Sequence, residues 1–332
     1  MGRVADWTPL AACVALPLLA VAAPAQERLL VPCLGLAADQ SPVFSTELFP
    51  DPTTEVSACF RLGAADTVQR LTAVFIAENV GAAAPPDYPI VEAELDLKGE
   101  KQGRFRFENP RPMPLGLYRV EVSADGRPWL AARYAIAAPS EDAAQAGELM
   151  PLAAGRRWTY RFEQRAGAGA RIDVPEIEPD AAGLYRATVT IEVIAEEEAG
   201  FHLVTSRNGQ PVFEEWWRRG EDGVLATRRK DGEQVIELDP PQRLVGTADG
   251  ERQWTYPPFA QTFRMWGPFP MKGEWGEGRG HVVLASQPAG LVTITAERHF
   301  VAGIGMVREI IIQALAGRMM SRQELDLIRA EP

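Results

Sequence analysis

The sequence predicts an all-β protein made of two parts, a sandwich of short strands followed by a curved antiparallel sheet. Segments such as "EVSACFRL" (residues 55–62) alternate apolar and polar side chains with the period of two that half-buried strands show. Dipeptides such as Asn208-Gly209 and Asp222-Gly223 separate many of these segments, and such residues favour the tight turns of β-hairpins. Both signals indicate antiparallel strands joined by short turns.

Residues 1–25 are predicted to be a signal peptide that does not belong to the fold. The uncharged run "LAACVALPLLAVAA" is too short to span a bilayer, and "APA" places small residues where a signal peptidase cleaves. "LAAC" resembles a lipobox, but Cys13 precedes most of the apolar run, so export without a lipid anchor is favoured. We therefore expect an exported protein, periplasmic or extracellular in a bacterium, with no transmembrane span in the mature chain.

Residues 26–138 are predicted to form an immunoglobulin-like sandwich. Asp125-Gly126 indicates a hairpin near the end of this region. The segment "PLGLYRVEVSADGRPW" resembles the closing hairpin of bacterial immunoglobulin-like modules, and this resemblance implies the same fold. The number and spacing of the expected strands suit such a sandwich, with strands near residues 30, 58, 73, 92, 105, 120 and 132.

The cysteine count indicates one disulfide. The chain has three cysteines, and Cys13 is removed with the signal peptide. Cys33 and Cys59 remain, and two cysteines in an exported chain are typical of a bonded pair. We expect a Cys33–Cys59 disulfide within the sandwich.

The second part follows a polar, alanine-rich linker predicted at residues 139–149, and residues 150–332 are expected to form a curved antiparallel sheet or half-barrel. Two further hairpin dipeptides, Asp231-Gly232 and Asp249-Gly250, separate its short strand-like segments. Neighbouring strands joined by tight turns are antiparallel, and about ten of them in one sheet curl strongly or partly close. The last strand is expected at about residues 319–328.

Two similar stretches, "PLAAGRRWTY" (residues 151–160) and "PFPMKGEWGEG" (residues 268–278), are each predicted to start a strand that a tryptophan anchors in the core. The first stretch matches the pattern P-L-x-x-G-x-x-W-x-Y, and "GIGMV" (residues 303–307) matches G-x-G-x-V. This combination resembles an uncharacterised β-rich domain of secreted bacterial proteins. The resemblance implies a half-barrel similar to lipoprotein carriers, whose concave face can hold acyl chains, and it brings no catalytic residues.

The sequence does not contain a recognisable catalytic constellation. The three histidines, at positions 202, 281 and 299, lack the paired spacing of metal ligands, so neither a metal nor another cofactor is expected. A formal net charge of −11 disfavours nucleic acid as a partner. A glycoside hydrolase that uses two carboxylates is the enzymatic alternative. Its conceivable members are Glu192, Glu214, Glu215 and Glu274.

Aromatic residues supply the candidate ligand contacts. Adjacent Trp216 and Trp217 are predicted to lie on opposite faces of one strand. The segment "WTYPPFAQTFRMWGPFP" (residues 254–270) is predicted to be a proline-broken loop that either caps the open end of the curved sheet or lines a cleft. The candidate contacts, which are expected to be packing residues first, are Trp216, Trp217, Trp254, Phe259 and Trp266.

The function expected from these features is that of a non-enzymatic exported envelope protein. It would bind an apolar or amphipathic ligand, lipid-like or sugar, in the concave face of the second part. The alternative is an adhesion or scaffold protein that acts through contacts with another envelope protein.

Overall fold

A computed structural model gives the structure of the chain, and its described residues exclude the predicted signal peptide and the predicted linker apart from Leu149. The described residues are 28–36, 42–63, 66–138, 149–167, 170, 172, 174, 177–181, 183–247, 252–289, 292–315 and 318–332. Among them, the helical elements are two short 3-10 turns, η1 (Gly81–Ala83) and η2 (Pro257–Phe259). The all-β fold class predicted from the sequence is confirmed.

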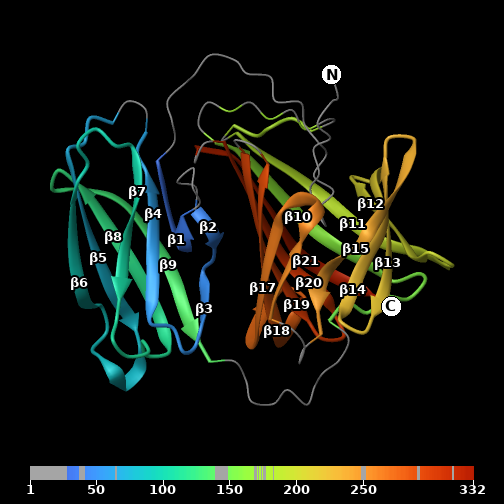
Figure 1. Cartoon of the computed structure of the whole chain (residues 1–332), viewed down its shortest axis with the longest axis horizontal. Coiled ribbons are helices and arrows are strands. Elements are labelled where there is room, and N and C mark those ends of the chain that lie inside the picture. Colours follow the sequence, from blue (N-terminus) through green and yellow to red (C-terminus); the bar gives the residue numbers. More distant parts are fainter. Residues whose placement is uncertain are drawn as a thin grey trace.

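The described residues before position 139 form nine strands in two sheets, drawn in blue to green in Figure 1. One sheet has the order β2-β1-β4-β7 and the other has the order β3-β9-β8-β5-β6. All seven expected strands are present, and the short β2 and β3 are additional. The strands are β1 (Leu29–Leu36), β2 (Pro42–Ser45), β3 (Leu48–Pro50), β4 (Glu55–Arg61), β5 (Arg70–Asn79), β6 (Tyr88–Asp96), β7 (Gln102–Glu108), β8 (Gly116–Ala124) and β9 (Arg127–Ala137).

A tyrosine corner supports the immunoglobulin-like character of this sandwich. The Tyr118 hydroxyl donates a hydrogen bond of 2.5 Å to the carbonyl of Pro114, which precedes β8. A tyrosine that bonds back to the backbone at the start of this strand is a hallmark of the fold. Burial raises the pKa of Tyr118 to about 12, so the phenol stays protonated and keeps donating.

The predicted disulfide is also confirmed. Cys33 in β1 and Cys59 in β4 are bonded, with their Cα atoms 6.3 Å apart, and both side chains are buried. The two strands are antiparallel neighbours in which Val31 pairs with Cys59, so the bond runs diagonally across the ladder. It ties the first described strand of the chain to the centre of its sheet.

The described residues from 157 onward form one antiparallel sheet of twelve strands, here called the curled sheet. Its order is β15-β14-β13-β12-β11-β10-β21-β20-β19-β18-β17-β16. The strands are β10 (Arg157–Ala166), β11 (Leu184–Glu197), β12 (Gly200–Arg207), β13 (Gln210–Gly220), β14 (Gly223–Asp231), β15 (Gln234–Gly246), β16 (Gln253–Tyr256), β17 (Gln261–Gly273), β18 (Gly276–Ala289), β19 (Val292–Val301), β20 (Gly305–Leu315) and β21 (Arg318–Glu331). The predicted final strand is confirmed as β21.

The sheet curls until its two edge strands, β15 and β16, meet through side chains. The Trp254 indole N–H donates 3.2 Å to the carbonyl of Arg243, and the Arg243 guanidinium lies 5.3 Å from the Trp254 ring centroid. Beside this contact, the Gln242 amide donates 2.5 Å to the Gln261 side chain. The seam is therefore closed by side-chain contacts.

The predicted loop at residues 254–270 is wrong, because this segment forms β16, η2 and most of β17. Phe263 and Met265 alternate inward with the strand period and are buried in the core. The pairing register shifts between Trp266 and Phe269, which accommodates the proline at position 268. Proline thus marks a bulge here and does not break the strand.

The two similar stretches play different structural roles. Residues 151–160 start a strand as predicted, because β10 begins at Arg157. Residues 268–278 also start a strand, because β18 begins at Gly276, but here the tryptophan, Trp275, lies in the turn between β17 and β18 and packs against the core while partly buried. A Cβ on Gly273 would lie 2.4 Å from the Trp275 indole nitrogen, so glycine there lets the indole fold over the strand end.

The hairpin dipeptides locate the turns to within one residue. Asn208-Gly209 forms its turn as predicted, since Arg207 pairs with Gln210. The next two turns are shifted by one residue, to positions 221–222 and 232–233. Asp249-Gly250 lies outside the described residues.

The two motifs that carry the family resemblance contact each other at one end of the curled sheet. The Trp158 indole N–H donates 2.6 Å to the carbonyl of Ile304, and the Tyr160 hydroxyl donates 2.9 Å to the carbonyl of Met306. Gly305 has φ +112°, and a Cβ there would lie 2.7 Å from the Trp158 indole nitrogen. The opening motif therefore packs into a space that the closing motif leaves free.

Candidate functional site

The concave face, where a ligand was predicted, is filled by side chains of the curled sheet. Trp217 and Trp254 belong to its buried core, and Phe259 packs against this core while partly exposed. Trp216 lies on the opposite face, where it stacks on His202 with ring centroids 4.4 Å apart. Trp266 packs near Val282, in a small cluster toward the sandwich. The five predicted contacts are thus distributed over both faces of the sheet.

The middle of the concave face also holds buried charges from opposite walls of the curled sheet. Glu215 and Arg229 pair at 2.6 Å across β13 and β14, and Arg298 and Glu309 pair at 2.6 Å across β19 and β20. Burial raises the pKa of Glu309, and Arg298 opposes this shift. These pairs occupy the centre of the space that a carrier would keep open.

The glutamates considered for a hydrolase do not face one another. Glu215 is inward, whereas Glu214 lies on the other face with Lys230 at 2.6 Å and His202 at 3.0 Å. Hydrogen bonding from Lys230 lowers the pKa of Glu214. Glu192 and Glu274 are each bound to a different arginine of β10, at 2.5 and 2.7 Å. This set does not form a facing pair of carboxylates.

The histidines are each held within local contacts. His299 lies 2.6 Å from Glu297, and His281 is buried on the concave face. Within the described residues, no group of three or more His, Cys, Asp or Glu side chains could hold a metal ion. The same residues contain no helix with the length and apolar character needed to cross a membrane.

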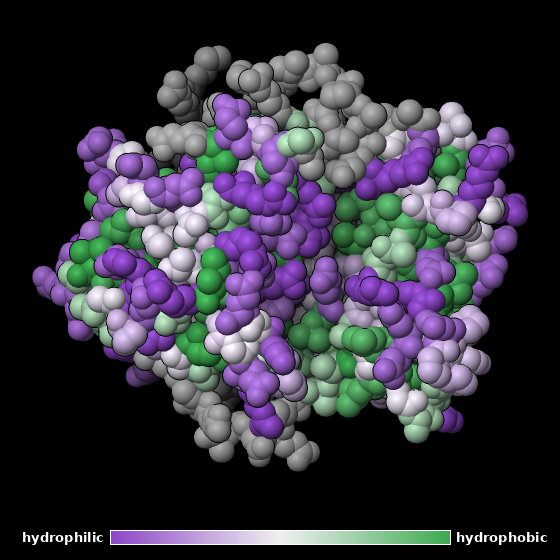
Figure 2. All heavy atoms as spheres, turned by 180° about the vertical axis from the view of Figure 1, so that it is seen from behind, coloured by the Kyte–Doolittle hydropathy of each residue, from purple (hydrophilic) through white to green (hydrophobic). Residues whose placement is uncertain are grey.

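A cleft lined by residues of the sandwich and of the outer face of the curled sheet lies between the two. Figure 1 shows how the two parts sit side by side, and β2 contacts β18 and β19 there. Seen from behind, hydrophilic side chains gather along the middle of the molecule beside a furrow between its two halves (Figure 2). The cleft contains a cavity of about 40 Å³, and a second cavity of about 10 Å³ shares part of its wall.

Strand alternation decides which residues of the curled sheet face this cleft. In β20, Ile310 and Ile312 point outward into it, whereas Ile311 between them is buried in the core of the concave face. The same alternation in β19 places Thr295 and Glu297 outward, and β21 contributes Arg322. The sandwich side of the cavity comprises Val31, Pro32, Ser45, Thr46 and Glu47.

Backbone hydrogen bonds fix the position of Glu47 between β2 and β3. The Ala135 amide of β9 donates 2.8 Å to the Glu47 carbonyl, and the Thr46 amide donates 3.2 Å to the carbonyl of Pro32 in β1. The Leu48 amide donates 3.0 Å to the Thr46 hydroxyl. Because both sheets of the sandwich hold this segment, the Glu47 carboxylate is presented to the cleft from a fixed backbone.

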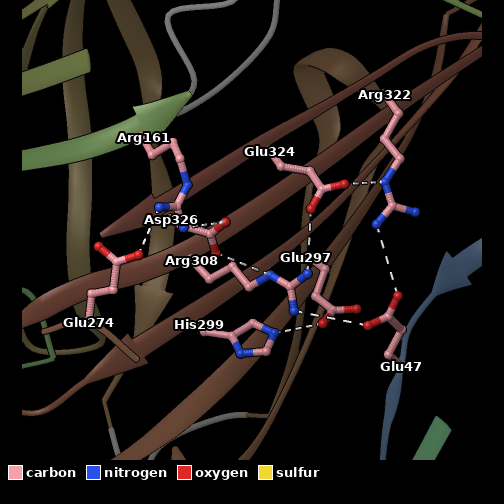
Figure 3. A network of polar contacts seen from close by, with 9 residues as sticks. All are labelled: Glu47, Arg161, Glu274, Glu297, His299, Arg308, Arg322, Glu324 and Asp326. Atoms are coloured by element: carbon pink, nitrogen blue, oxygen red, sulfur yellow. Dashed lines mark hydrogen bonds and ion pairs between the residues drawn. The ribbon is translucent and has the colours of Figure 1, made fainter. Parts of the chain in front are cut away.

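Glu47 reaches a network of charged residues on the curled sheet (Figure 3). Its carboxylate lies 4.0 Å from the Arg308 guanidinium and 3.9 Å from that of Arg322. Both arginines have nearer partners on β21. Arg322 lies 2.7 Å from Glu324, and Arg308 lies 3.5 Å from Glu324 and 3.6 Å from Asp326. The contacts to Glu47 are therefore the longest ion pairs that these two arginines make among the described residues.

The cleft is amphipathic. Its lining includes the apolar side chains of Val31, Ile310 and Ile312 together with the carboxylates of Glu47 and Glu297. None of the residues predicted from the sequence to contact a ligand lines this cleft. The available signal was the alternation of charged residues along residues 322–326, but such a pattern is also typical of a strand face exposed to water.

Comparisons with known proteins do not identify a family. No protein-family model and no curated protein matches the chain. Among solved structures, a Bacteroides fragilis protein described as exported and as having a YmcC-like fold aligns with 10% identity and a TM-score of 0.28 over 56% of this chain and 100% of its own. A Parabacteroides distasonis protein described as a lipoprotein aligns with 12% identity and a TM-score of 0.28 over 56% of this chain and 99% of its own. Both scores are too low to indicate a shared function.

Proposed function

We propose that the protein is a non-enzymatic exported envelope protein that binds an amphipathic ligand in the cleft between the sandwich and the curled sheet. The observation that carries this proposal is that apolar side chains, Ile310 and Ile312, and charged side chains, Glu47, Glu297 and Arg322, line one cavity. Binding sites for small molecules combine mostly apolar walls with a few placed polar groups.

Export is supported by the apolar leader with its "APA" cleavage signal and by the buried Cys33–Cys59 disulfide. Disulfides persist in oxidising compartments such as the periplasm and the extracellular space. The division into a sandwich at residues 26–138 and a second domain at residues 150–332 is part of the same proposal. The cleft lies between these two domains.

The cleft is a better place for the ligand than the concave face predicted from the sequence. The concave face is occupied by aromatic side chains such as Trp158 and Trp217 and by two buried Glu–Arg pairs. Opening it would expose this core and separate buried charges, which is costly. The cleft borders on solvent, and the buried Glu–Arg pairs of the concave face are not among its lining residues.

The cavity volume limits what part of the ligand enters. A cavity needs about 10–15 Å³ for each water, so 40 Å³ holds about three waters. This space matches the head group and the first carbons of a chain. The rest of an amphipathic ligand would extend along the neighbouring cavity beside Ile312 and Ala314.

The proposal is tested by binding of a straight-chain alkyl series, from C4 to C10 with amine, alcohol and carboxylate heads, followed by ligand-observed NMR. Ile312→Arg places a charge among the apolar lining residues and is expected to abolish binding. Ile194→Arg is the matched control, because Ile194 is 50% exposed on β11. Binding that is absent for the whole series, or that survives Ile312→Arg, would contradict the proposed site.

A second candidate function, a scaffold that contacts another envelope protein, is favoured by exposed apolar side chains on the sandwich. Tyr88, Leu115 and Leu117 are 49%, 48% and 53% exposed. Tyr88 pairs with Ala77 of β5, and Leu117 pairs with nearby Asn79 on the other side of β5. A photo-crosslinking residue at position 117 should give a discrete adduct in the native envelope. The same residue at position 235, where Val235 is 51% exposed, is the control, and equal labelling would contradict a specific contact.

A further inference from the structure

We infer that the cleft recognises a primary ammonium group carried on an unbranched methylene stem, with Glu47 and Glu297 as its carboxylate partners. This inference rests on the proposed function, because it names the chemical class of the ligand for the same cleft. It is argued from the charge balance, the hydrogen-bonding groups and the size of the cavity.

Carboxylates outnumber guanidiniums in the network around the cleft. The nine residues drawn in Figure 3 include five acidic residues and three arginines, the ninth being His299. Arg161 and Glu274 pair with each other at 2.7 Å at the far end of the network. The remaining arginines, Arg308 and Arg322, lie nearest to Glu324 and Asp326. Glu47 and Glu297, which both line the cavity, are therefore left with the weaker or neutral partners, Glu47 with guanidiniums at 3.9 and 4.0 Å and Glu297 with the His299 imidazole at 2.6 Å. A cationic head group is the complement of these carboxylates.

Glu47 is the carboxylate most available to a ligand. Its side chain is 52% exposed, and its two arginine contacts are 3.9 and 4.0 Å long, compared with 2.7 Å between Arg322 and Glu324. Contacts of this length exceed the usual range for a charge-assisted hydrogen bond. Glu297 is different, since its side chain is 5% exposed and lies 2.6 Å from His299. An ammonium could thus meet one fixed carboxylate and one that can still move toward it.

The neutral polar groups that line the cavity can accept hydrogen bonds from the N–H groups of an ammonium. An ammonium has three N–H donors and no acceptor. The cavity wall offers the hydroxyl oxygens of Ser45 and Thr295 in addition to the two carboxylates. Among the described residues that line the cavity, Arg322 is the single arginine, and its guanidinium forms an ion pair of 2.7 Å with Glu324. The wall therefore provides enough acceptors for all three donors of an ammonium.

The size of the cavity favours an unbranched stem. Space for about three waters corresponds to about three non-hydrogen atoms, which fits a nitrogen followed by two methylenes. The adjoining 10 Å³ cavity shares Val31 and Ile312 with the first and adds Leu29, Ala314 and Met319, so the next methylenes would meet apolar side chains. Such a stem occurs in free alkylamines and in lysine side chains.

The test compares n-hexylamine, n-hexanol and hexanoate, which share one chain length, by titration calorimetry and ligand-observed NMR. We expect hexylamine to bind about tenfold more tightly than hexanol, and hexanoate to bind weakest. Glu47→Gln keeps the shape of an exposed side chain and should remove most of the advantage of the amine. Glu163→Gln, in the exposed ladder with Arg186, is the control and should leave the affinity unchanged. Glu297→Gln should act like Glu47→Gln, and its thermal melt reports whether it remains folded.

The outcomes separate the inference from the proposed function. Equal binding of hexylamine and hexanol, or a Glu47→Gln variant that retains the preference for the amine, would overturn the ammonium site while the amphipathic cleft stands. A failure of all three compounds to bind would overturn both. Nα-acetyl-lysine N-methylamide shows whether the natural ligand is a lysine side chain or a free alkylamine. Tighter binding of this compound than of hexylamine indicates a lysine side chain, and tighter binding of hexylamine indicates a free amine.

Discussion

Replacing Gly305 by alanine should destabilise the fold, because the Trp158 ring packs directly against the Gly305 backbone in the closing motif. An added Cβ would lie 2.7 Å from the indole nitrogen, 3.2 Å from Cε2 of the same ring and 3.3 Å from the Met150 sulfur. The backbone φ of +112° is also one that residues with a Cβ rarely adopt. Backbone strain of this kind costs about 1–3 kcal/mol, and overpacking of a filled core costs about 1–3 kcal/mol. We therefore expect Gly305→Ala to lower the free energy of unfolding by about 2–6 kcal/mol.

Gly303→Ala is the matched control for this prediction. Gly303 has φ +75°, but an added Cβ would meet nothing within 4 Å, so the strain of a positive φ is its main cost, about 1–2 kcal/mol. Urea unfolding followed by tryptophan fluorescence measures both variants. Combining Gly305→Ala with Trp158→Phe, which shortens the ring, should recover part of the loss through a favourable coupling energy. Equal losses for the two glycine variants, or no coupling to Trp158, would refute the proposed contact between the motifs.

Three further predictions concern other parts of the fold. Arg298→Met should destabilise the protein by about 3–5 kcal/mol because it leaves the buried Glu309 carboxylate without its cation, whereas adding Glu309→Leu should restore most of the loss in urea unfolding. Lys230→Met should reduce the pH dependence of stability. Lys230 lowers the folded pKa of Glu214 below its ordinary value of 4.5, so this stabilisation is present above that value and is lost as the pH falls through the folded pKa. The unfolding free energies of the two proteins should therefore converge at low pH, and a constant difference would contradict the assignment. Cys59→Ala removes a disulfide that spans 26 residues and should lower the free energy of unfolding by about 3 kcal/mol relative to the unsubstituted protein. Under reducing conditions the two proteins should be equally stable, and a difference that persists there would contradict a contribution from the disulfide.

Strands and turns were predictable because their signals are local. Alternation in residues 55–62 identified β4, and Asn208-Gly209 identified the turn between β12 and β13. The proline at position 268 misled the prediction of residues 254–270, because a proline at a bulge and a proline that ends a strand look the same in sequence. Residue type gives no information on pairing register, which decides between these cases.

The candidate site was not predictable because it depends on contacts between distant segments. Glu47 lies more than 250 residues before Arg308 and Arg322, yet its carboxylate lies within 4.0 Å of both. Glu297 and Glu324 belong to strands whose outer face resembles a solvated surface. Only the docking of the sandwich against that face turns it into the wall of a cleft. The aromatic residues suggested ligand contacts, but aromatic side chains also fill cores, and Trp217 and Trp254 do so.

The position of the ligand is tested most directly by NMR of isoleucine δ1 methyl groups during titration with n-hexylamine. Three neighbours on β20 report on the two faces of the curled sheet, since Ile310 and Ile312 line the cleft and Ile311 lies in the core of the concave face. Binding in the cleft should shift the methyl signals of Ile310 and Ile312 and leave that of Ile311 unchanged. Shifts confined to Ile311, or to Ile191 on the same concave face, would place the ligand inside the curled sheet and contradict the cleft.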